Sequence, residues 1–227
     1  MSVNSNGYIH FGGEIKKLLT ILLLSFGFGT VIHVPDEYST IQEGINAAME
    51  GDTVLVAAGT YSPSTNSEVF PIEMASGIHL IGSGEDVSII DAQQTDRVIT
   101  MEDCDNNTIS DLTLTGGLAD SYGGGMRLSN SNPILTNVTI SNNTANWGGG
   151  MHLNASNPIL NHVTISNNTA EIFGGGMVLF FSNPILNNMT ISNNTASEAS
   201  GMRLYDSDPI LTHVTISNNT AVYHGGG

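Results

Sequence analysis

The sequence predicts an all-β fold: a parallel β-helix, or solenoid, of 25–26 residues per coil with a short N-terminal capping α-helix. The first observation is a repeat, because a methionine after a run of glycines recurs at intervals of 25, 26 and 25 residues. The second is the alternation of apolar and polar residues within each repeat, which is typical of strands. The third is the placing of Gly, Asn-Pro and Asn-Asn between these strands, where corners are expected. The recurring residues are Met126, Met151, Met177 and Met202.

The first predicted element is a signal-peptide-like segment over residues 1–29. Lys16 and Lys17 precede a run of about a dozen mostly apolar residues, Leu18 to Gly29, which is too short to span a bilayer and suits the core of a secretory signal. We expect cleavage before Thr30; a buried first strand is the alternative interpretation. The one cysteine of the chain excludes an intramolecular disulfide. An exported domain of this kind must therefore be held together by packing and hydrogen bonds.

Residues 30–227 are predicted to form the β-helix domain, which begins with an amphipathic helix over about residues 39–50. The stretch "STIQEGINAAMEGD" offers Ser39 or Thr40 as the N-cap, followed three residues later by Gln42 or Glu43, as in a capping box. A helix at this position covers the open end of the first coil and protects an edge that would otherwise pair with other chains. Its predicted apolar face consists of Ile41, Ile45, Ala48 and Met49.

The regular repeats run over residues 123–227. Parallel coils lie about 4.8 Å apart, so each residue lies on its counterpart in the next coil and like residues form ladders. Asparagine side chains in such a ladder hydrogen-bond up and down the stack. Repeat length varies only after "NNTA", where we expect a surface loop. The predicted structural ladder consists of Asn143, Asn168, Asn194 and Asn219.

Two stretches of the chain resemble known families. "VPDEYSTIQEGINAAMEGDTVLVAAGTY" resembles the opening segment of pectin-lyase-like right-handed parallel β-helix proteins. "GGGM" followed by "ISNN" resembles the repeats of polymorphic outer-membrane proteins, which pair a GGA-plus-aliphatic motif with Phe-x-x-Asn; here Gly124-Gly125-Met126 and Ile140-x-x-Asn143 take those places. The third glycine, and Ile in place of Phe, are departures. The resemblance covers roughly residues 31–227 and implies a single-stranded right-handed helix, export, and a passenger-like surface role, often adhesion.

Charge and the chain end bear on partners and location. The formal net charge is −16, which argues against nucleic acid or an anionic membrane surface as a partner. We expect an extracellular protein, secreted or associated with the outer membrane, whose partner is a polysaccharide or a host or cell-surface protein. The sequence stops at Gly227, one residue before the next expected methionine. We therefore expect a truncated C-terminus or further coils, with a membrane reached only through a missing C-terminal anchor or barrel.

The sequence offers no complete catalytic site and indicates neither a cofactor nor a metal site. Glycoside hydrolysis usually needs two carboxylates about 5 to 9.5 Å apart, whereas Asp206 and Asp208 lie over residues without acidic groups in the neighbouring coils. Lyase chemistry would need a base beside metal-binding acids, and Arg127 and Arg203 lie three coils apart, about 14 Å. The sequence thus favours a binding protein over an enzyme whose active site lies in degenerate or missing coils.

Surface aromatic residues supply the candidate ligand-binding site. In a solenoid otherwise rich in Asn and Thr, they suit stacking on sugar rings or on a protein partner. The leading hypothesis is adhesion or carbohydrate binding. The alternatives are a polysaccharide-degrading enzyme of pectate-lyase or glycoside-hydrolase type, a passive structural stalk, and, for Phe180 and Tyr205, simple mutual shielding. The candidates are Trp147, Phe173, Phe180, Phe181, Tyr205 and Tyr223.

Overall fold

The structure is a computed structural model that describes residues 2–3, 9–10 and 29–226. The apolar run of the predicted signal segment, residues 18–28, lies outside the described residues. Near the start of the chain, β1 (Ser2–Val3) and β2 (Ile9–His10) form an antiparallel pair. In the described part of the chain, no helix has both the length and the apolar character needed to cross a membrane.

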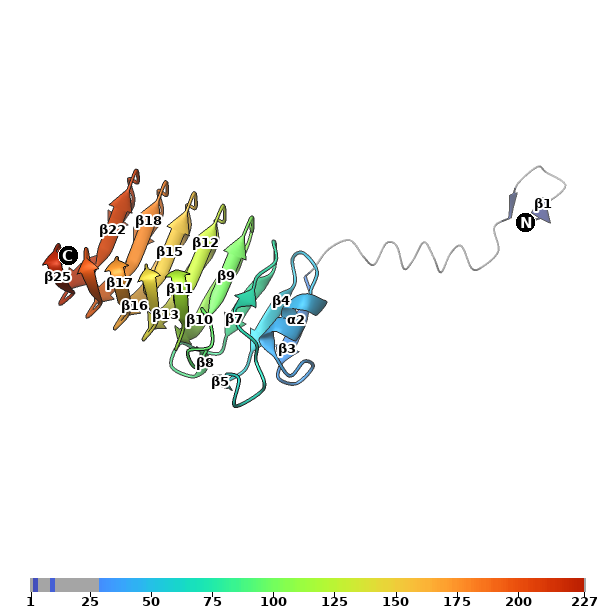
Figure 1. Cartoon of the computed structure of the whole chain (residues 1–227). Coiled ribbons are helices and arrows are strands. Elements are labelled where there is room, and N and C mark those ends of the chain that lie inside the picture. Colours follow the sequence, from blue (N-terminus) through green and yellow to red (C-terminus); the bar gives the residue numbers. More distant parts are fainter. Residues whose placement is uncertain (1, 4–8, 11–28, 227) are drawn as a thin grey trace.

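The chain forms a parallel β-solenoid of about seven turns with one helix (Figure 1). Figure 1 shows the coils following one another along the solenoid axis in sequence order. Successive coils stack in register, so that Met126 pairs with Met151 and Met151 with Met177. The predicted all-β parallel solenoid with a 25–26-residue period is confirmed.

The strands of the solenoid form three sheets that run along the axis. The six-stranded sheet consists of β6 (Ile72–Glu73), β9 (Ile99–Glu102), β12 (Met126–Ser129), β15 (Met151–Asn154), β18 (Met177–Phe180) and β22 (Met202–Tyr205). The five-stranded sheet consists of β11 (Leu118–Tyr122), β14 (Thr144–Trp147), β17 (Thr169–Phe173), β21 (Thr195–Glu198) and β25 (Thr220–His224). The twelve-stranded sheet consists of β3 (Val31–Val34), β4 (Thr53–Val56), β5 (Gly59–Tyr61), β7 (His79–Gly82), β8 (Ser88–Asp91), β10 (Thr108–Thr115), β13 (Ile134–Ser141), β16 (Ile159–Ser166), β19 (Ile185–Asn187), β20 (Thr190–Ser192), β23 (Ile210–Thr212) and β24 (Thr215–Ser217).

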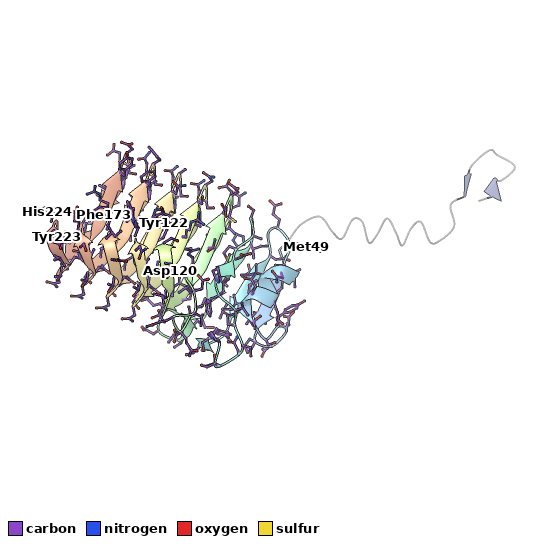
Figure 2. The ribbon with its side chains drawn as sticks, viewed as in Figure 1. Met49, Asp120, Tyr122, Phe173, Tyr223 and His224 are labelled. Atoms are coloured by element: carbon purple, nitrogen blue, oxygen red, sulfur yellow. The ribbon has the colours of Figure 1, made fainter. Side chains whose placement is uncertain are left out.

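The predicted helix is α2 (Ile41–Ala47). Thr40 is its N-cap and forms a capping box with Glu43, as predicted: the Thr40 hydroxyl accepts from the Glu43 N–H at 3.1 Å, and the Glu43 carboxylate accepts from the Thr40 N–H at 3.2 Å. The helix is shorter than predicted, because Ala48 is already extended. Met49 is 76% exposed (Figure 2) and does not belong to the apolar face, because the Asp52 carboxylate accepts the Met49 N–H at 2.8 Å and holds a turn there.

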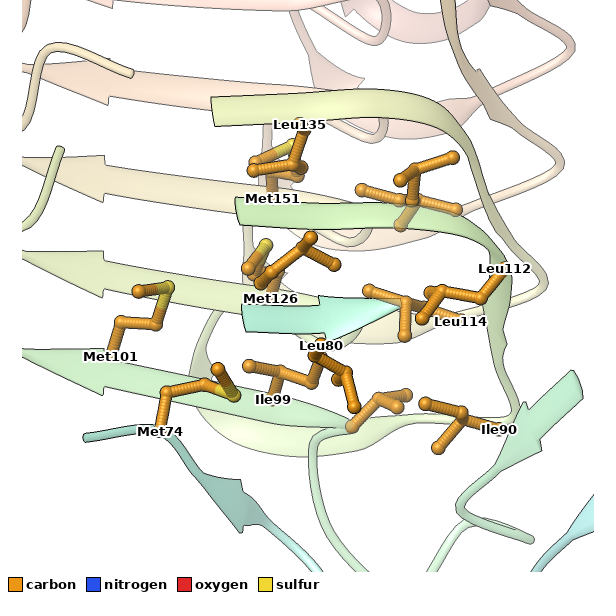
Figure 3. Close-up of a cluster of buried hydrophobic side chains, with 14 of the residues drawn as sticks. Met74, Leu80, Ile90, Ile99, Met101, Leu112, Leu114, Met126, Leu135 and Met151 are labelled. Atoms are coloured by element: carbon orange, nitrogen blue, oxygen red, sulfur yellow. The ribbon is translucent and has the colours of Figure 1, made fainter. Parts of the chain in front are cut away.

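The core is a stack of inward-pointing apolar side chains, mainly from the twelve-stranded and six-stranded sheets (Figure 3). Met126 of the six-stranded sheet and Leu114 and Leu135 of the twelve-stranded sheet are all fully buried. Because each such residue has an apolar counterpart in the coil above and below, every layer of the core covers the next. This requirement accounts for the similarity of the repeats.

Buried asparagines line one corner of the stack. The Asn168 Oδ1 atom accepts from the backbone N–H and the Nδ2 group of Asn143, at 3.0 and 3.1 Å. Its own Nδ2 group donates to the Ile140 carbonyl at 2.9 Å and to the Asn194 Oδ1 atom at 3.1 Å. The same pattern continues from Asn194 to Asn219. The ladder therefore satisfies backbone groups that would otherwise be buried without partners.

The longest segment of the coil is divided differently along the solenoid. In β13 the residues "IL" continue into "TNVTIS" as one strand, whereas in the later coils the two parts are separate strands, β19 and β20 or β23 and β24. Asn137 adopts a φ of 53° within β13. The left-handed residue breaks the alternation, so Leu135 and Val138, three positions apart, both point into the core.

The segment after "NNTA" was expected to be a surface loop, and this is wrong: in each coil it forms a strand of the five-stranded sheet. In β14 and β17, Ala145 pairs with Ala170, the register then shifts, and Trp147 pairs with Phe173. The additional residue of β17 is therefore absorbed by a β-bulge. Variation in repeat length marks a bulged strand end here, and this strand end carries aromatic residues.

Candidate functional site

A cleft lies on the outer face of the six-stranded sheet, beside the strand ends of the five-stranded sheet. Its cavity has a volume of about 290 Å³ and takes its lining from both sheets. We call this site the aromatic cleft: its first wall is Tyr122, Trp147 and Phe173, its floor is Arg127, His152, Val178 and Arg203, and its second wall is Asn154, Phe180 and Tyr205.

The first wall is a column of aromatic residues from three successive coils. Tyr122 pairs with Trp147 and Trp147 with Phe173, and Figure 2 shows Tyr122 and Phe173 along the row of coils. The ring centroids are 6.2 Å apart for Tyr122 and Trp147 and 4.8 Å for Trp147 and Phe173, both edge to face. Glu198 and His224 continue the column in the next two coils. The aromatic wall is thus limited to three coils.

The floor of the cleft comes from the outward positions of the six-stranded sheet. In β12, Met126 and Leu128 point into the core, so Arg127 points outward. Arg127 lies in register between Thr100 and His152. Further along the floor, the Arg203 guanidinium lies 4.8 Å from the centroid of the Phe173 ring, within the range of a cation–π contact.

His152 occupies an outward position but is only 6% exposed. The Tyr122 ring covers it, with 4.6 Å between ring centroids. Its Nδ1 atom is buried without a hydrogen-bond partner among the described residues. Burial, together with the charges of Arg127 and Arg97, lowers the pKa of His152 to about 4. The imidazole is therefore neutral at pH 7.

Arg97 supports the cleft from behind the first wall. Its guanidinium donates to the Tyr122 carbonyl at 3.0 Å and to the Gly123 carbonyl at 3.2 Å. These bonds tie it to the turn that ends β11. Arg97 thus holds the backbone under Tyr122 and adds positive charge to the site.

The second wall consists of side chains next to the floor on the same sheet. Asn154 pairs with Phe180 and Phe180 with Tyr205. The Phe180 and Tyr205 rings are stacked, with 4.5 Å between centroids and 11° between planes. Phe181, which has a φ of 49°, packs its ring at right angles against both. Tyr205 and Phe181 remain about half exposed, at 49% and 52%.

The structure brings together five of the six predicted aromatic residues. Trp147 and Phe180 line the cavity, Phe173 touches Trp147, and Tyr205 and Phe181 pack on Phe180. The sixth, Tyr223, is 70% exposed on β25 and lies outside the column, because its neighbour His224 is the residue in register.

Sequence reasoning missed the cavity-lining residues Tyr122, Arg127, His152 and Asn154. A signal was present for the first of them. An aromatic residue stands directly before the glycine triplet in three successive repeats, as Tyr122, Trp147 and Phe173. Aligning the repeats on the glycines rather than on "NNTA" would have placed Tyr122 in the column.

The lining of the cavity carries no carboxylate among the described residues. Asp206 and Asp208, the acidic residues considered above for glycoside hydrolysis, lie at a corner of the last coil. There the Asp208 N–H donates to the Asn183 Oδ1 atom at 2.6 Å. Within residues 29–226, no group of three or more His, Cys, Asp and Glu side chains converges as a metal site would require. The chemistry available in the cleft is therefore stacking, cationic hydrogen bonding and the neutral imidazole.

Comparison with known proteins identifies the fold. Residues 75–227 match the family model described as "Right handed beta helix region", and no curated protein matches the chain. Pectin methylesterase PemA from Erwinia chrysanthemi is similar in structure, with a TM-score of 0.50 and 13% identity over 81% of this chain and 61% of that one. A pectin methylesterase in complex with hexasaccharide VII gives a TM-score of 0.51 and 12% identity over 86% and 68% of the two chains. The match to PemA thus spans less than two thirds of that enzyme. The likeness shows the fold and confirms the pectin-lyase-like, right-handed helix that the sequence predicts.

Proposed function

We propose that this chain, which belongs to the right-handed β-helix family, is a carbohydrate-binding domain of a secreted or cell-surface protein, used for adhesion and without a complete catalytic site. The aromatic cleft is the proposed binding site. One observation carries the proposal: two aromatic walls from different sheets face a common cavity, with Trp147 on one side and Phe180 on the other.

The walls suit a ligand with flat apolar faces and polar edges. Aromatic rings bind such a ligand through their faces and leave its hydroxyl groups free to hydrogen-bond. Asn154, which lines the cavity, supplies an amide donor and acceptor at the same place. Because the walls extend over successive coils about 4.8 Å apart, the cleft suits an extended chain of sugar rings.

The structural neighbours support a carbohydrate partner. One pectin methylesterase of the same fold was studied in complex with a hexasaccharide. For the present chain this is an analogy of fold, and the argument for binding depends on the cleft itself.

We propose export and a surface location on the basis of the signal-peptide-like segment over residues 1–29 and of the resemblance to polymorphic outer-membrane protein repeats. We further propose that α2 is the N-terminal cap of the solenoid. The helix contacts β3 and β4, and its Ile41 and Ile45 side chains are buried. A Cβ atom at Gly44 would lie 3.1 Å from Val34 Cγ2 and 3.2 Å from Val54 Cγ1, so the helix packs closely on these strands.

The test is a glycan-array screen of the full chain, followed by titration of the best ligand. We expect Trp147→Ala and Phe180→Ala each to weaken binding by about 10- to 100-fold, since a well-placed aromatic contact contributes about 1–3 kcal/mol. Tyr223→Ala is the matched control, because it removes an exposed aromatic residue outside the cleft. No binding to any glycan, or equal losses in all three variants, would refute the proposal.

The same samples distinguish the enzyme hypothesis. Release of reducing ends or unsaturated ends from the bound polysaccharide is measured in parallel. Product release that disappears in the Trp147→Ala variant would replace the binding-domain proposal with an enzyme. Binding without product release supports the proposal as stated.

A further inference from the structure

The cationic residues of this acidic chain converge on the aromatic cleft. The sequence has 21 Asp and Glu residues but only 5 Lys and Arg residues. Two of the five are Lys16 and Lys17, which lie outside the described residues. The other three are Arg97, Arg127 and Arg203, and all of them lie at the cleft: one behind its first wall and two on its floor.

Arg127 presents its guanidinium to the cavity without an acidic neighbour in its own ladder. It lines the cavity, and the residues in register with it are Thr100 and His152. The acids lie around the cleft rather than in it: Glu102 is one coil away in the adjacent column, and Glu198 follows Phe173 in the first wall. The positive charge of Arg127 is therefore left for a ligand to neutralise.

His152 is a second, independent indication of a ligand site. Its side chain lies beside Arg127 with 6% exposure and an Nδ1 atom that has no partner in the described part of the chain. Buried polar atoms normally have partners, so an orphaned one in a cavity wall indicates a group that is supplied from outside.

We infer that the aromatic cleft selects an anionic saccharide, whose sugar-borne oxyanion binds the Arg127 guanidinium while its ring packs against Trp147. This inference rests on the proposed function. The shared ligand chemistry is an oxyanion on a sugar ring, either a carboxylate or a sulfate ester. Guanidinium binds both in a bidentate manner, more strongly than it binds neutral acceptors.

The second floor arginine indicates the direction of the ligand. Arg203 lies three coils from Arg127 in the same column, a separation of about 14 Å. It is held over the Phe173 ring at the far end of the first wall. An acidic chain that lies along the solenoid axis places one charged group at Arg127 and another at Arg203.

The experiment is calorimetric titration of the full chain with three probes. The first is a tetrameric uronic-acid oligosaccharide, the second is its fully methyl-esterified form, which keeps the rings and loses the charge, and the third is a sulfated galactan tetrasaccharide. The variants are Arg127→Gln and, as the matched control, Asn188→Asp. The control makes the same change in net charge at an exposed position in the bend between β19 and β20, where φ is already 52°, which Asp tolerates.

We expect at least one acidic probe to bind about 10- to 100-fold more tightly than the esterified one, as for a hydrogen bond to a charged group. Arg127→Gln should abolish this preference while weak binding of the esterified probe persists, and Asn188→Asp should leave the preference intact. Preference for the carboxylated or the sulfated probe identifies the source of the anion.

Equal binding of the acidic and esterified probes, or a preference that survives Arg127→Gln, would overturn the inference and leave the proposed function standing. Absence of binding by all three probes, in a protein that also fails the glycan screen, would overturn both.

Discussion

Replacing Asn168 by alanine is predicted to destabilise the solenoid more than replacing its exposed neighbour Asn167 by glycine. Asn168 is fully buried, and its side chain takes part in four hydrogen bonds that connect three coils. Alanine removes all four. It also leaves the buried N–H group of Asn143 without the acceptor that it has at 3.0 Å.

The magnitude follows from these bonds. Each one contributes about 0.5–1.5 kcal/mol net, and a buried donor left without an acceptor costs about 1–3 kcal/mol. The four bonds and the orphaned N–H group of Asn143 overlap in part, so the terms are not simply additive. We expect Asn168→Ala to lower the free energy of unfolding by about 3–5 kcal/mol.

The assay is urea denaturation followed by circular dichroism and by the fluorescence of Trp147, the one tryptophan of the chain. Asn167→Gly is the control: Asn167 is exposed and has a φ of 57°, which glycine adopts freely. Its expected effect is below about 1 kcal/mol. A loss below about 1 kcal/mol for Asn168→Ala, or equal losses for the two variants, would refute the view that the ladder stabilises the stack.

Three further predictions concern other parts of the fold. Because folding lowers the pKa of His152 from 6.5 to about 4, the unfolded chain takes up its proton first. The free energy of unfolding is therefore unaffected by this group above pH 6.5 and falls by up to about 3 kcal/mol as the pH drops to 4. His152→Gln, which keeps Arg127, Arg97 and Tyr122 around the site, should remove that part of the pH dependence in denaturation curves. An unchanged pH dependence would contradict the assignment to His152. The Glu68 carboxylate accepts from the Ile41 and Gln42 N–H groups at 2.7 and 3.2 Å. Glu68→Ala should therefore lower the free energy of unfolding by about 2–3 kcal/mol, and Glu68→Gln, which keeps one acceptor, by about half as much. Equal losses for the two variants in calorimetry would argue against a role of Glu68 in capping the N-terminus of α2. At Gly150 a Cβ atom would lie 2.5 Å from the Gly176 carbonyl oxygen. Because this contact is with backbone, which cannot move aside as a flexible side chain can, Gly150→Ala should lower the melting temperature by more than 10 °C. An unchanged melting temperature would show that the two coils can move apart.

The scaffold was predictable because stacking imposes the same demand on every coil. Residues such as Met126 and Ile140 must cover their counterparts, so the periodicity of the sequence reports the structure directly. The cleft was less predictable, because it depends on contacts between different sheets. The alternation of the strand puts His152 at an outward position, but only the position of the Tyr122 ring buries it. The bend at Asn137 was missed for a related reason: an asparagine between polar residues reads the same whether it is extended or left-handed.

The repeats themselves indicate which face of the solenoid is free to carry a function. On the twelve-stranded sheet, one outward column reads Thr139, Thr164, Thr190 and Thr215 without change. On the six-stranded sheet, the corresponding outward column reads Arg127, His152, Val178 and Arg203. Both columns face away from the core, so packing inside the solenoid makes no distinction between them. A uniform threonine column stabilises neighbouring strands through pairs of like residues. A column that mixes charged, imidazole and aliphatic side chains gains no such stabilisation from pairing. The varied column is also the one that the aromatic walls enclose, so its variation agrees with the ligand recognition proposed for this face.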